Sequence, residues 1–363
     1  MTSNTTPEQS DLTLGFVPLL DCAPLIAAHE LGYFECQGLN VRLQKEGSWA
    51  SLRDKLMVGL LDGAHLLAPM VLASHLGKAS TRVSPLTTAL ALGQNGNALT
   101  FSNDLVEQMG KPEPGNLEAV TKGLARAAER RIMEGKPLIF GTVYPFSIHT
   151  NLLRLLFRKA GLTLNQDVSI QVVPPTRMVS ALANQDVDGY CVGEPWNSAA
   201  ASCGQGQLLL LGSDLWPQAP DKVFGVSEDF SASAPKSHAS LVRALMQACQ
   251  WLDQPDRTAT LAHWLAQPHY LDCSSDLLLR AMQTPWRDGL PRWRKIFFRD
   301  FASYPFHSHG RWLLEQLLVQ DQLPLNGIDR TSLLERAYNK TLWEEVAQQA
   351  GLELPVTAPP VPD

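Results

Sequence analysis

Two histidines separated by one residue, His307 and His309, are a candidate for metal chemistry in this sequence. On a strand, residues i and i+2 share one face, so both imidazoles could bind the same ion. No carboxylate or cysteine lies near the pair at ligand spacing. We therefore expect a structural or surface role for these histidines, and metal ligation is the alternative.

The six cysteines could also bind a metal or carry redox chemistry, but their spacing favours neither. No two of them form a C-x-x-C pair, so neither a zinc ribbon nor a dithiol motif is present. We expect free, buried thiols in a reducing compartment. The cysteines are Cys22, Cys36, Cys191, Cys203, Cys249 and Cys273.

Sequence motifs of common enzymes are missing. The chain has no G-x-S-x-G, no Walker loop, no G-x-G-x-x-G after a strand and no H-E-x-x-H. Residues 93–97 contain two glycines, but their spacing fits no phosphate-binding fingerprint. These observations favour a binding protein over an enzyme.

The composition narrows the class of protein further. The 363 residues are 45% hydrophobic and 18% charged, which excludes a disordered chain or a coiled coil. No apolar run is long enough for a transmembrane helix. The net charge of −6 and the lack of a basic block argue against direct binding of nucleic acid. We expect a well-packed globular protein of two lobes or one large α/β domain.

The first eleven residues, Met1 to Asp11, do not resemble a secretion signal. They contain no basic region, no apolar core and no small-residue cleavage site. Unless the chain has been trimmed, we expect the protein to stay in the cytoplasm.

Strand and helix patterns alternate at the start of the chain. Period-two hydrophobicity predicts strands over 12–16 and 40–44, with a helix over 23–31 between them. This βαβ unit implies a parallel sheet. A helix capped by Ser48 would place Leu52, Leu56 and Leu60 on one face.

A second α/β stretch follows, and the last third of the chain has a helical pattern. The second stretch has predicted helices over 116–134, about 148–160 and 177–183, and strands over 138–140, 170–173 and 189–192. From about residue 233 to 346 we expect helices whose six tryptophans fill a core. Residues 354–363 include four prolines and are expected to form a loose tail.

Several segments, in one order along the chain, resemble the nitrate- and bicarbonate-binding substrate proteins of ABC transporters, the NrtA and CmpA family. The resemblance spans about residues 12 to 345. Its segments are 16–28, which begins Phe-Val-Pro-Leu, 32–34, 38–41, 48–56, 62–70, Gly-Glu-Pro-Trp-Asn at 193–197 and Tyr-Pro-Phe-His-Ser-His at 304–309.

This resemblance implies an α/β fold of the type II periplasmic-binding-protein class, in which ligand binds in a cleft between two lobes. The first part of lobe one would be 1–98 and lobe two 99–222. Residues 223–353 would return to lobe one, with C-terminal helices packed on it, and 354–363 would be the proline-rich tail.

The resemblance also implies a binding site made of Trp49, Asn97, His149 and Lys222. Trp49 would supply a flat wall, His149 a donor, and Asn97 an amide where family members commonly have Gln. Lys222 matches a position that is Lys in nitrate binders and acidic in bicarbonate binders, so it favours nitrate or nitrite with no metal or other cofactor. Without the resemblance, Trp49 could be a core residue, His149 a helix cap and Lys222 a surface lysine.

A cytoplasmic member of this family would resemble its signal-less nitrate sensors, the NasS type. Such a sensor holds a NasT-type ANTAR RNA-binding response regulator and releases it when nitrate or nitrite binds, a population shift between two forms. The resemblance thus implies contact with a protein partner, with no direct nucleic-acid or membrane binding. Three alternatives stay open: a transporter substrate-binding protein, a pyrimidine-precursor synthase-like enzyme, and a regulatory domain detached from a nitrate-transporter ATPase.

Overall fold

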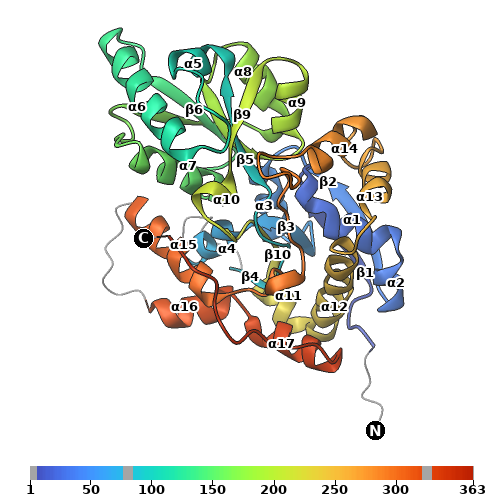
Figure 1. Ribbon diagram of the computed structural model, residues 1–363. Coiled ribbons are helices and arrows are strands. Elements are labelled where there is room, and N and C mark those ends of the chain that lie inside the picture. The colour runs from blue at the N-terminus through green and yellow to red at the C-terminus, as the bar shows by residue number, and fades with distance from the viewer. Residues whose placement is uncertain (1–5, 77–84, 321–328, 363) are drawn as a thin grey trace.

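The computed structural model describes residues 6–76, 85–320 and 329–362, which fold into two α/β lobes (Figure 1). Each lobe contains a five-stranded sheet. The sheet of the first lobe has the order β2-β1-β3-β10-β4, and that of the second lobe has the order β7-β6-β8-β5-β9. The predicted α/β class and two-lobed organisation are confirmed.

The strands of both sheets are five or six residues long. The first sheet contains β1 (Asp11–Phe16), β2 (Asn40–Lys45), β3 (Gly63–Leu67), β4 (Leu86–Ala91) and β10 (Lys222–Ser227). The second contains β5 (Asn97–Ser102), β6 (Leu138–Thr142), β7 (Val168–Val172), β8 (Gly189–Gly193) and β9 (Gly206–Leu211).

Both sheets are mixed, whereas the βαβ pattern predicted a parallel sheet. β1 runs parallel to β2 and β3, as predicted. β10 is antiparallel to β3 and β4, and β5 is antiparallel to β8 and β9. The reason is that the chain passes between the lobes after β4 and again after β9, so each sheet gains a strand of opposite direction.

Helices cover both sheets (Figure 1). Those in the second-lobe part of the chain are α5 (Asn103–Gln108), α6 (Leu117–Met133), α7 (Ile148–Lys159), α8 (Met178–Ala183), α9 (Trp196–Ser202) and α10 (Gly212–Leu215). The others are α1 (Ala23–Glu30), α2 (Tyr33–Cys36), α3 (Trp49–Met57), α4 (Ala68–His75), α11 (Glu228–Ser233), α12 (Pro235–Leu252), α13 (Thr258–Leu265), α14 (Ser275–Gln283), α15 (His307–Gln320), α16 (Arg330–Ala337) and α17 (Lys340–Gln349). In the described ranges, no helix has the length and apolar character needed to span a membrane.

The start of α3 agrees with the sequence prediction, but its end does not. The Ser48 hydroxyl accepts a hydrogen bond from the Ser51 amide at 3.2 Å and caps the helix. Leu52 and Leu56 are buried, whereas Leu60 is 67% exposed. The prediction for Leu60 was wrong because α3 ends at Met57, before the third turn of the apolar stripe.

The tryptophans of the C-terminal third only partly fill a core. Trp312 and Trp343 are buried as predicted. The other four, Trp251, Trp264, Trp286 and Trp293, are partly exposed at the edges of the hydrophobic clusters. Trp251 and Trp264 stack on each other with ring centroids 5.2 Å apart. Some of these rings therefore cover a core from outside instead of occupying its centre.

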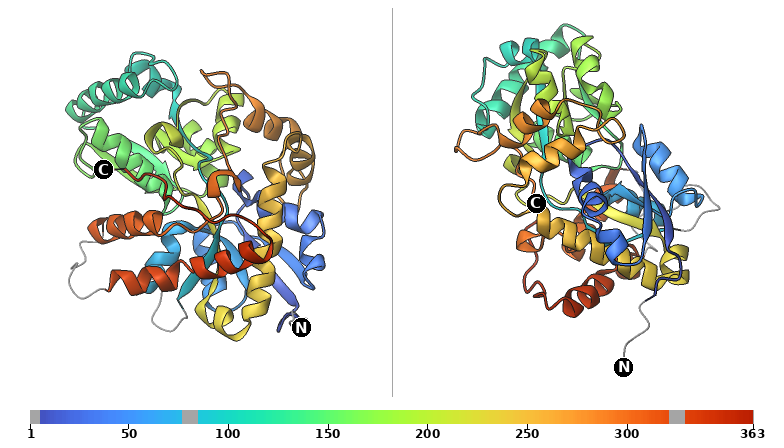
Figure 2. Two further views of the ribbon diagram at one scale, coloured as in Figure 1. Left: turned by 60° about the horizontal axis from the view of Figure 1, so that its bottom comes forward. Right: turned by 90° about the vertical axis from the view of Figure 1, so that its right-hand side faces the viewer.

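The C-terminal tail is hydrogen-bonded at two carbonyl groups, which differs from the expected loose segment. The indole of Trp216 donates to the Pro360 carbonyl at 3.2 Å, and the indole of Trp312 donates to that of Pro362 at 2.8 Å. Figure 2 shows this end of the chain beside the green helices of the second lobe. The tail therefore runs from α17 back to the region where the lobes meet.

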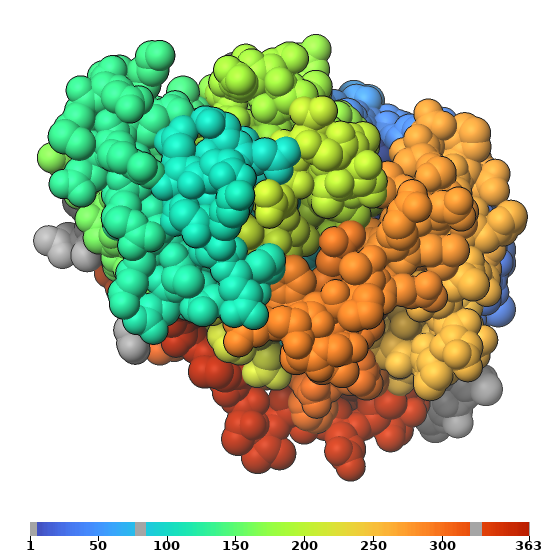
Figure 3. Space-filling view, turned by 45° about the horizontal axis from the view of Figure 1, so that its top comes forward, coloured from blue at the N-terminus to red at the C-terminus, as the bar shows by residue number. Residues whose placement is uncertain are grey.

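A further segment, residues 284–299, contacts both lobes, and we call it the strap. Trp286 packs against Ala98, Leu208 and Leu211 of the second lobe. At the other end, the Asp253 carboxylate at the end of α12 accepts hydrogen bonds from the backbone amides of residues 297, 298 and 299. In Figure 3 the orange surface that includes the strap lies between the second lobe and the C-terminal helices.

Candidate functional site

Two aspartates and two lysines meet where the lobes join. We call these four side chains the buried charge cluster: Asp21, Asp221, Lys222 and Lys295. Lys222 Nζ lies 2.6 Å from Asp21 Oδ2 and also contacts Asp221 Oδ1. Lys295 Nζ lies 2.8 Å from Asp221 Oδ2. The Asp221, Lys222 and Lys295 side chains are completely inaccessible to solvent.

Local structure explains how these residues meet. Asp21 lies in the 3-10 turn Leu20–Cys22 between β1 and α1. Lys222 is the first residue of β10, where it pairs with Leu67 at the end of β3. Lys295 belongs to the strap. The cluster thus joins a turn, a central strand and the segment that contacts both lobes.

Mutual attraction keeps the cluster ionised despite its burial. Burial by itself raises the pKa of Asp21, but Lys222 and His65 hold that pKa well below its usual range. Burial also raises the pKa of Asp221, and Lys222 and Lys295 lower it overall. Burial lowers the pKa of Lys222, yet the two carboxylates raise it above its ordinary value. The two carboxylates and two ammonium groups give the cluster a net charge of zero.

The indole of Trp49 lies beside this cluster. Trp49 is the first residue of α3, and its ring is buried. Lys222 Nζ lies 5.7 Å from the centroid of the ring, and the His65 ring lies 5.1 Å away. The indole Nε1 is buried with no hydrogen-bond partner in the described part of the chain. A buried donor of this kind is available to a bound acceptor.

His149 brings a second set of buried, unpaired polar atoms. It is the second residue of α7, whose N-cap Ser147 accepts a hydrogen bond from the Thr150 amide at 3.1 Å. Neither ring nitrogen has a partner among residues 6–76, 85–320 and 329–362. Burial, reinforced by the charge of Lys222, lowers the pKa of His149 to about 3. The imidazole is therefore neutral at physiological pH and can donate one N–H.

Asn97 completes the set of residues predicted from the sequence. It is the first residue of β5, and its amide donates to Asp221 Oδ1 at 3.0 Å. Its carbonyl oxygen is buried without a partner in the described ranges. The structure thus places Asn97 and Trp49 beside the charge cluster that contains Lys222, and the charges of the cluster act on His149. Ligand contact by these four residues stays a prediction.

Two contacts between the lobes surround this region. The Leu20 amide donates to the Glu194 carbonyl at 2.8 Å, which joins the turn carrying Asp21 to the end of β8. The Arg53 guanidinium in α3 donates to the Tyr144 hydroxyl, which precedes α7. The lobes are therefore linked next to both Trp49 and His149.

Sequence reasoning missed three residues that shape the site: Asp21, His65 and Lys295. Asp21 and His65 lie inside segments that resemble the family, but nothing in their spacing connects them. The structure places His65 Nε2 3.0 Å from Asp21 Oδ1. Lys295 lies in a stretch with no motif, so its approach to Asp221 could not be predicted.

The two histidines considered as metal ligands have structural contacts. Both lie in α15, a helix and not a strand, so they point in different directions. The ring Nε2 of His307 lies 2.9 Å from the Tyr338 carbonyl. The buried ring of His309 packs edge-on against Trp216 and Phe306. No group of three or more potential metal ligands exists among the described residues.

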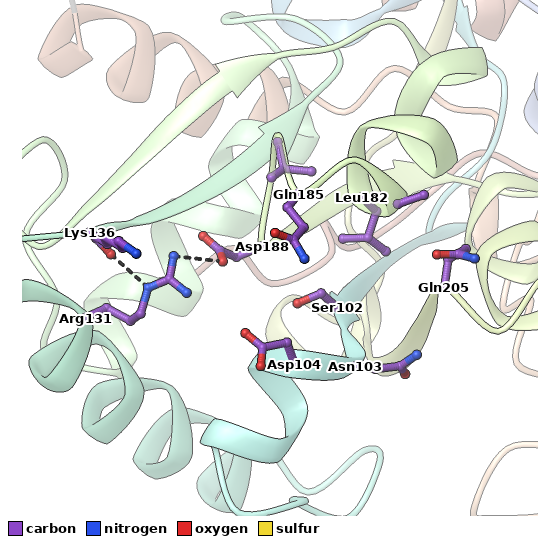
Figure 4. A pocket seen from close by; sticks show the side chains of 11 residues that line it. Ser102, Asn103, Asp104, Arg131, Lys136, Leu182, Gln185, Asp188 and Gln205 are labelled. Carbon is purple, nitrogen blue, oxygen red and sulfur yellow. Dashed lines mark hydrogen bonds and ion pairs between the residues drawn. The ribbon is translucent and has the colours of Figure 1, made fainter. Parts of the chain in front are cut away.

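A polar cavity of about 320 Å³ lies elsewhere, on the second lobe. Figure 4 shows Arg131, Lys136 and Asp188 among the side chains that line it. Arg131 Nη2 lies 3.3 Å from Asp188 Oδ1, and its Nε donates to the Lys136 carbonyl at 2.9 Å. None of the four predicted site residues lines this cavity.

Comparisons with known proteins agree with this architecture. A model of the NMT1-like family matches residues 5–266. The nitrate import ATP-binding protein NrtC of Synechocystis is 33% identical over 353 residues, which is 95% of this chain and 51% of that protein. The nitrate/nitrite binding protein NrtA of Nostoc is 29% identical, over 97% of this chain and 80% of that protein.

The crystal structure of the periplasmic nitrate-binding protein NrtA from Synechocystis superposes with a TM-score of 0.85 at 27% identity. The superposition covers 95% of this chain and 90% of that one. This similarity confirms the periplasmic-binding-protein fold. The chain spans about half the length of the first curated relatives it matches, which are ATP-binding proteins of nitrate import and bicarbonate transport. The sequence contains no Walker loop.

Proposed function

Because the chain belongs to the NMT1-like family, we propose that it is a nitrate- or nitrite-binding protein whose ligand lies between the two lobes. The observation that carries this proposal is the buried charge cluster together with two donor side chains, Trp49 and His149, whose ring nitrogens have no partner in the part of the chain that the structure describes. The names of the NrtA relatives give the ligand class.

The chemistry of the site suits a planar monoanion. Nitrate is delocalised and weakly hydrated, so it needs directed N–H donors and a flat wall more than a concentrated positive charge. The Trp49 ring supplies a wall with an N–H at its edge, and the neutral His149 supplies another donor. The ammonium group of Lys222 lies beside the Trp49 ring, 5.7 Å from its centroid. Each donor bonded to a charged acceptor contributes about 1.5–3 kcal/mol.

Lys222 is not an isolated cation. It already faces two carboxylates, so a bound anion would share its ammonium group with Asp21 and Asp221. The neutral cluster lowers the electrostatic barrier to a monoanion without attracting a second one. A dianion such as sulfate would bring twice the unbalanced charge of nitrate into this neutral cluster, and burying an unpaired charge is costly.

We further propose that this protein is a cytoplasmic sensor of the NasS type, which holds a NasT-type ANTAR regulator and releases it on binding nitrate. The resemblance to the NrtA and CmpA family, in which such sensors occur, supports this role. The free cysteines, two of them exposed at positions 36 and 203, suit a reducing compartment. Linkage requires that the regulator in turn weakens nitrate binding by the same factor.

A solute-binding role in a nitrate import system is the second candidate function. The similarity to NrtA and to about half of NrtC supports it as strongly as the sensor role is supported. The two candidates share the anion site and differ in the partner protein: the sensor would bind its regulator in the ligand-free form, whereas the import protein would deliver its ligand to a transporter. A binding assay with the regulator therefore distinguishes them.

The test has two steps. Calorimetric titration with nitrate, nitrite, bicarbonate and sulfate should show saturable binding of nitrate or nitrite at one site, without added metal. Calcium-dependent bicarbonate binding would refute the ligand. Purified NasT-type regulator should then co-elute with the protein on size exclusion without nitrate and separate with it. A regulator that never binds would refute the sensor role and leave the import role.

A further inference from the structure

The site contains one feature that a monoanion site does not require: two buried aspartates. Asp21 and Asp221 both contact Lys222. These three groups alone would have a net charge of −1. A buried excess negative charge repels an incoming anion strongly, because screening by solvent is weak there.

Lys295 supplies the charge that balances this excess. Its ammonium group lies 2.8 Å from Asp221 Oδ2, while Lys222 contacts the other oxygen of the same carboxylate. Both side chains are fully shielded from solvent. Among the described residues, the ion pairs of Asp221 are with these two lysines.

The strap places Lys295 through its pairing with residues 93–97. The Gln94 amide donates to the Ile296 carbonyl at 2.8 Å, and the Ile296 amide donates back at 3.2 Å. A Cβ on Gly96 would lie 2.9 Å from the Lys295 Cδ, and one on Gly93 would lie 2.4 Å from the Ile296 carbonyl oxygen. Both glycines have positive φ, at 97° and 107°. The glycine-bearing segment that matches no phosphate motif therefore serves to let the strap approach.

We propose that Lys295 is a specificity-determining residue of the anion site, which acts without touching the ligand by neutralising Asp221. This inference rests on the proposed anion binding. Lys222 can share its ammonium group with a monovalent oxyanion because Lys295 balances the second carboxylate. Since Lys295 belongs to the strap, anion affinity depends on the strap being seated across both lobes.

The experiment compares two single charge variants and their double variant in the full chain. Calorimetric titration measures the nitrate affinity of each. Lys295→Met should weaken nitrate binding at least about tenfold, because it leaves the cluster with a net negative charge. Asp221→Asn should strengthen binding, because it leaves a net positive charge. The double variant restores neutrality and should bind within about threefold of the unmodified protein. Lys122→Met, an equal change of net charge on an exposed helix position, should change affinity less than about twofold.

The outcomes separate this inference from the function on which it rests. If the unmodified protein binds nitrate and Lys295→Met binds it equally well, the role of Lys295 is refuted while nitrate binding stands. A double variant as weak as Lys295→Met would also refute it, since a structural defect is not repaired by removing a carboxylate. If Lys295→Met does not fold, Asp221→Asn decides, and weaker binding in that variant overturns the inference. If the unmodified protein binds no anion, both proposals fail.

Discussion

The buried charge cluster and the polar cavity of the second lobe use similar residue types in opposite ways. In the cavity, Arg131 and Asp188 are 19% and 16% exposed, and they satisfy each other and nearby backbone groups. In the cluster the charges are shielded from solvent, and the adjacent Trp49 and His149 have polar atoms with no partner in the described ranges. Water compensates polar groups in an open cavity, whereas buried donors need a ligand or a protein acceptor. This contrast is the reason we propose the cluster, and not the cavity, as the recognition site.

The largest expected effect is on folding when the cluster loses one charge. Lys222→Ala leaves Asp21 and Asp221 facing each other, and among the described residues Lys295 is the lysine still paired with Asp221. We expect a loss of about 3–5 kcal/mol in the free energy of unfolding, measured by denaturant titration. The sequence alone, which treats Lys222 as an isolated ligand, predicts an intact fold. A loss below about 1 kcal/mol would show that the cluster contributes no more than a surface ion pair.

Lowering the pH should change the free energy of unfolding in opposite directions through His149, next to the cluster, and through Asp188, in the cavity. The pKa of His149 is about 3, against an ordinary value of 6.5, so the unfolded chain takes up the proton first. His149 therefore costs stability as pH falls below 6.5, by about 2 kcal/mol at pH 5. Asp188 acts oppositely: burial raises its pKa, so acidification relieves the cost of its charge.

The check is the free energy of unfolding at pH 8 and pH 5. His149→Gln, which cannot titrate, should lose less stability between these two values than the unmodified protein. Asp188→Asn should lack the opposing contribution, which appears as the pH falls through the raised pKa of Asp188. Equal losses in His149→Gln and the unmodified protein would contradict a buried neutral imidazole at this position.

A smaller effect is expected when one donor of the site is removed. Trp49→Phe keeps an aromatic wall beside Lys222 but deletes the indole N–H, which has no partner in the described ranges. We expect nitrate affinity to fall about tenfold, the value of one hydrogen bond to a charged acceptor. Calorimetry measures the change, and Trp264→Phe, far along the chain in α13, is the matched control. Unchanged affinity would mean that the indole only packs against the site.

The smallest effect is predicted for the cavity. Arg131→Ala removes the ion pair to Asp188, which is partly exposed. We expect a change in unfolding free energy of less than about 1 kcal/mol and no change in nitrate affinity. A loss of nitrate binding in this variant would move the recognition site from the cluster to the second lobe.

Sequence patterns predicted most local elements because single residues determine their ends. Ser48 and Asn116 cap α3 and α6 through side-chain oxygens, as their residue types predict. The direction of β10 and β5 could not be predicted, because it depends on where the chain crosses between the lobes and not on local hydrophobic spacing.

Residues of the candidate site could be named from the sequence only at positions that match the family resemblance. Trp49, Asn97 and Lys222 were singled out this way, and the structure brings them to one cluster. The partners that set its net charge were not predictable, because the charges come from separate segments. Lys295 reaches Asp221 from 74 residues away in the sequence, and only the fold of the strap joins them.

The most direct test of the account is a high-resolution crystal structure of the protein grown with nitrate. The account predicts a planar ion between the lobes, within about 3 Å of the Trp49 indole nitrogen, a His149 ring nitrogen and Lys222 Nζ. An ion beside Arg131 in the second-lobe cavity, with none at the cluster, would contradict it.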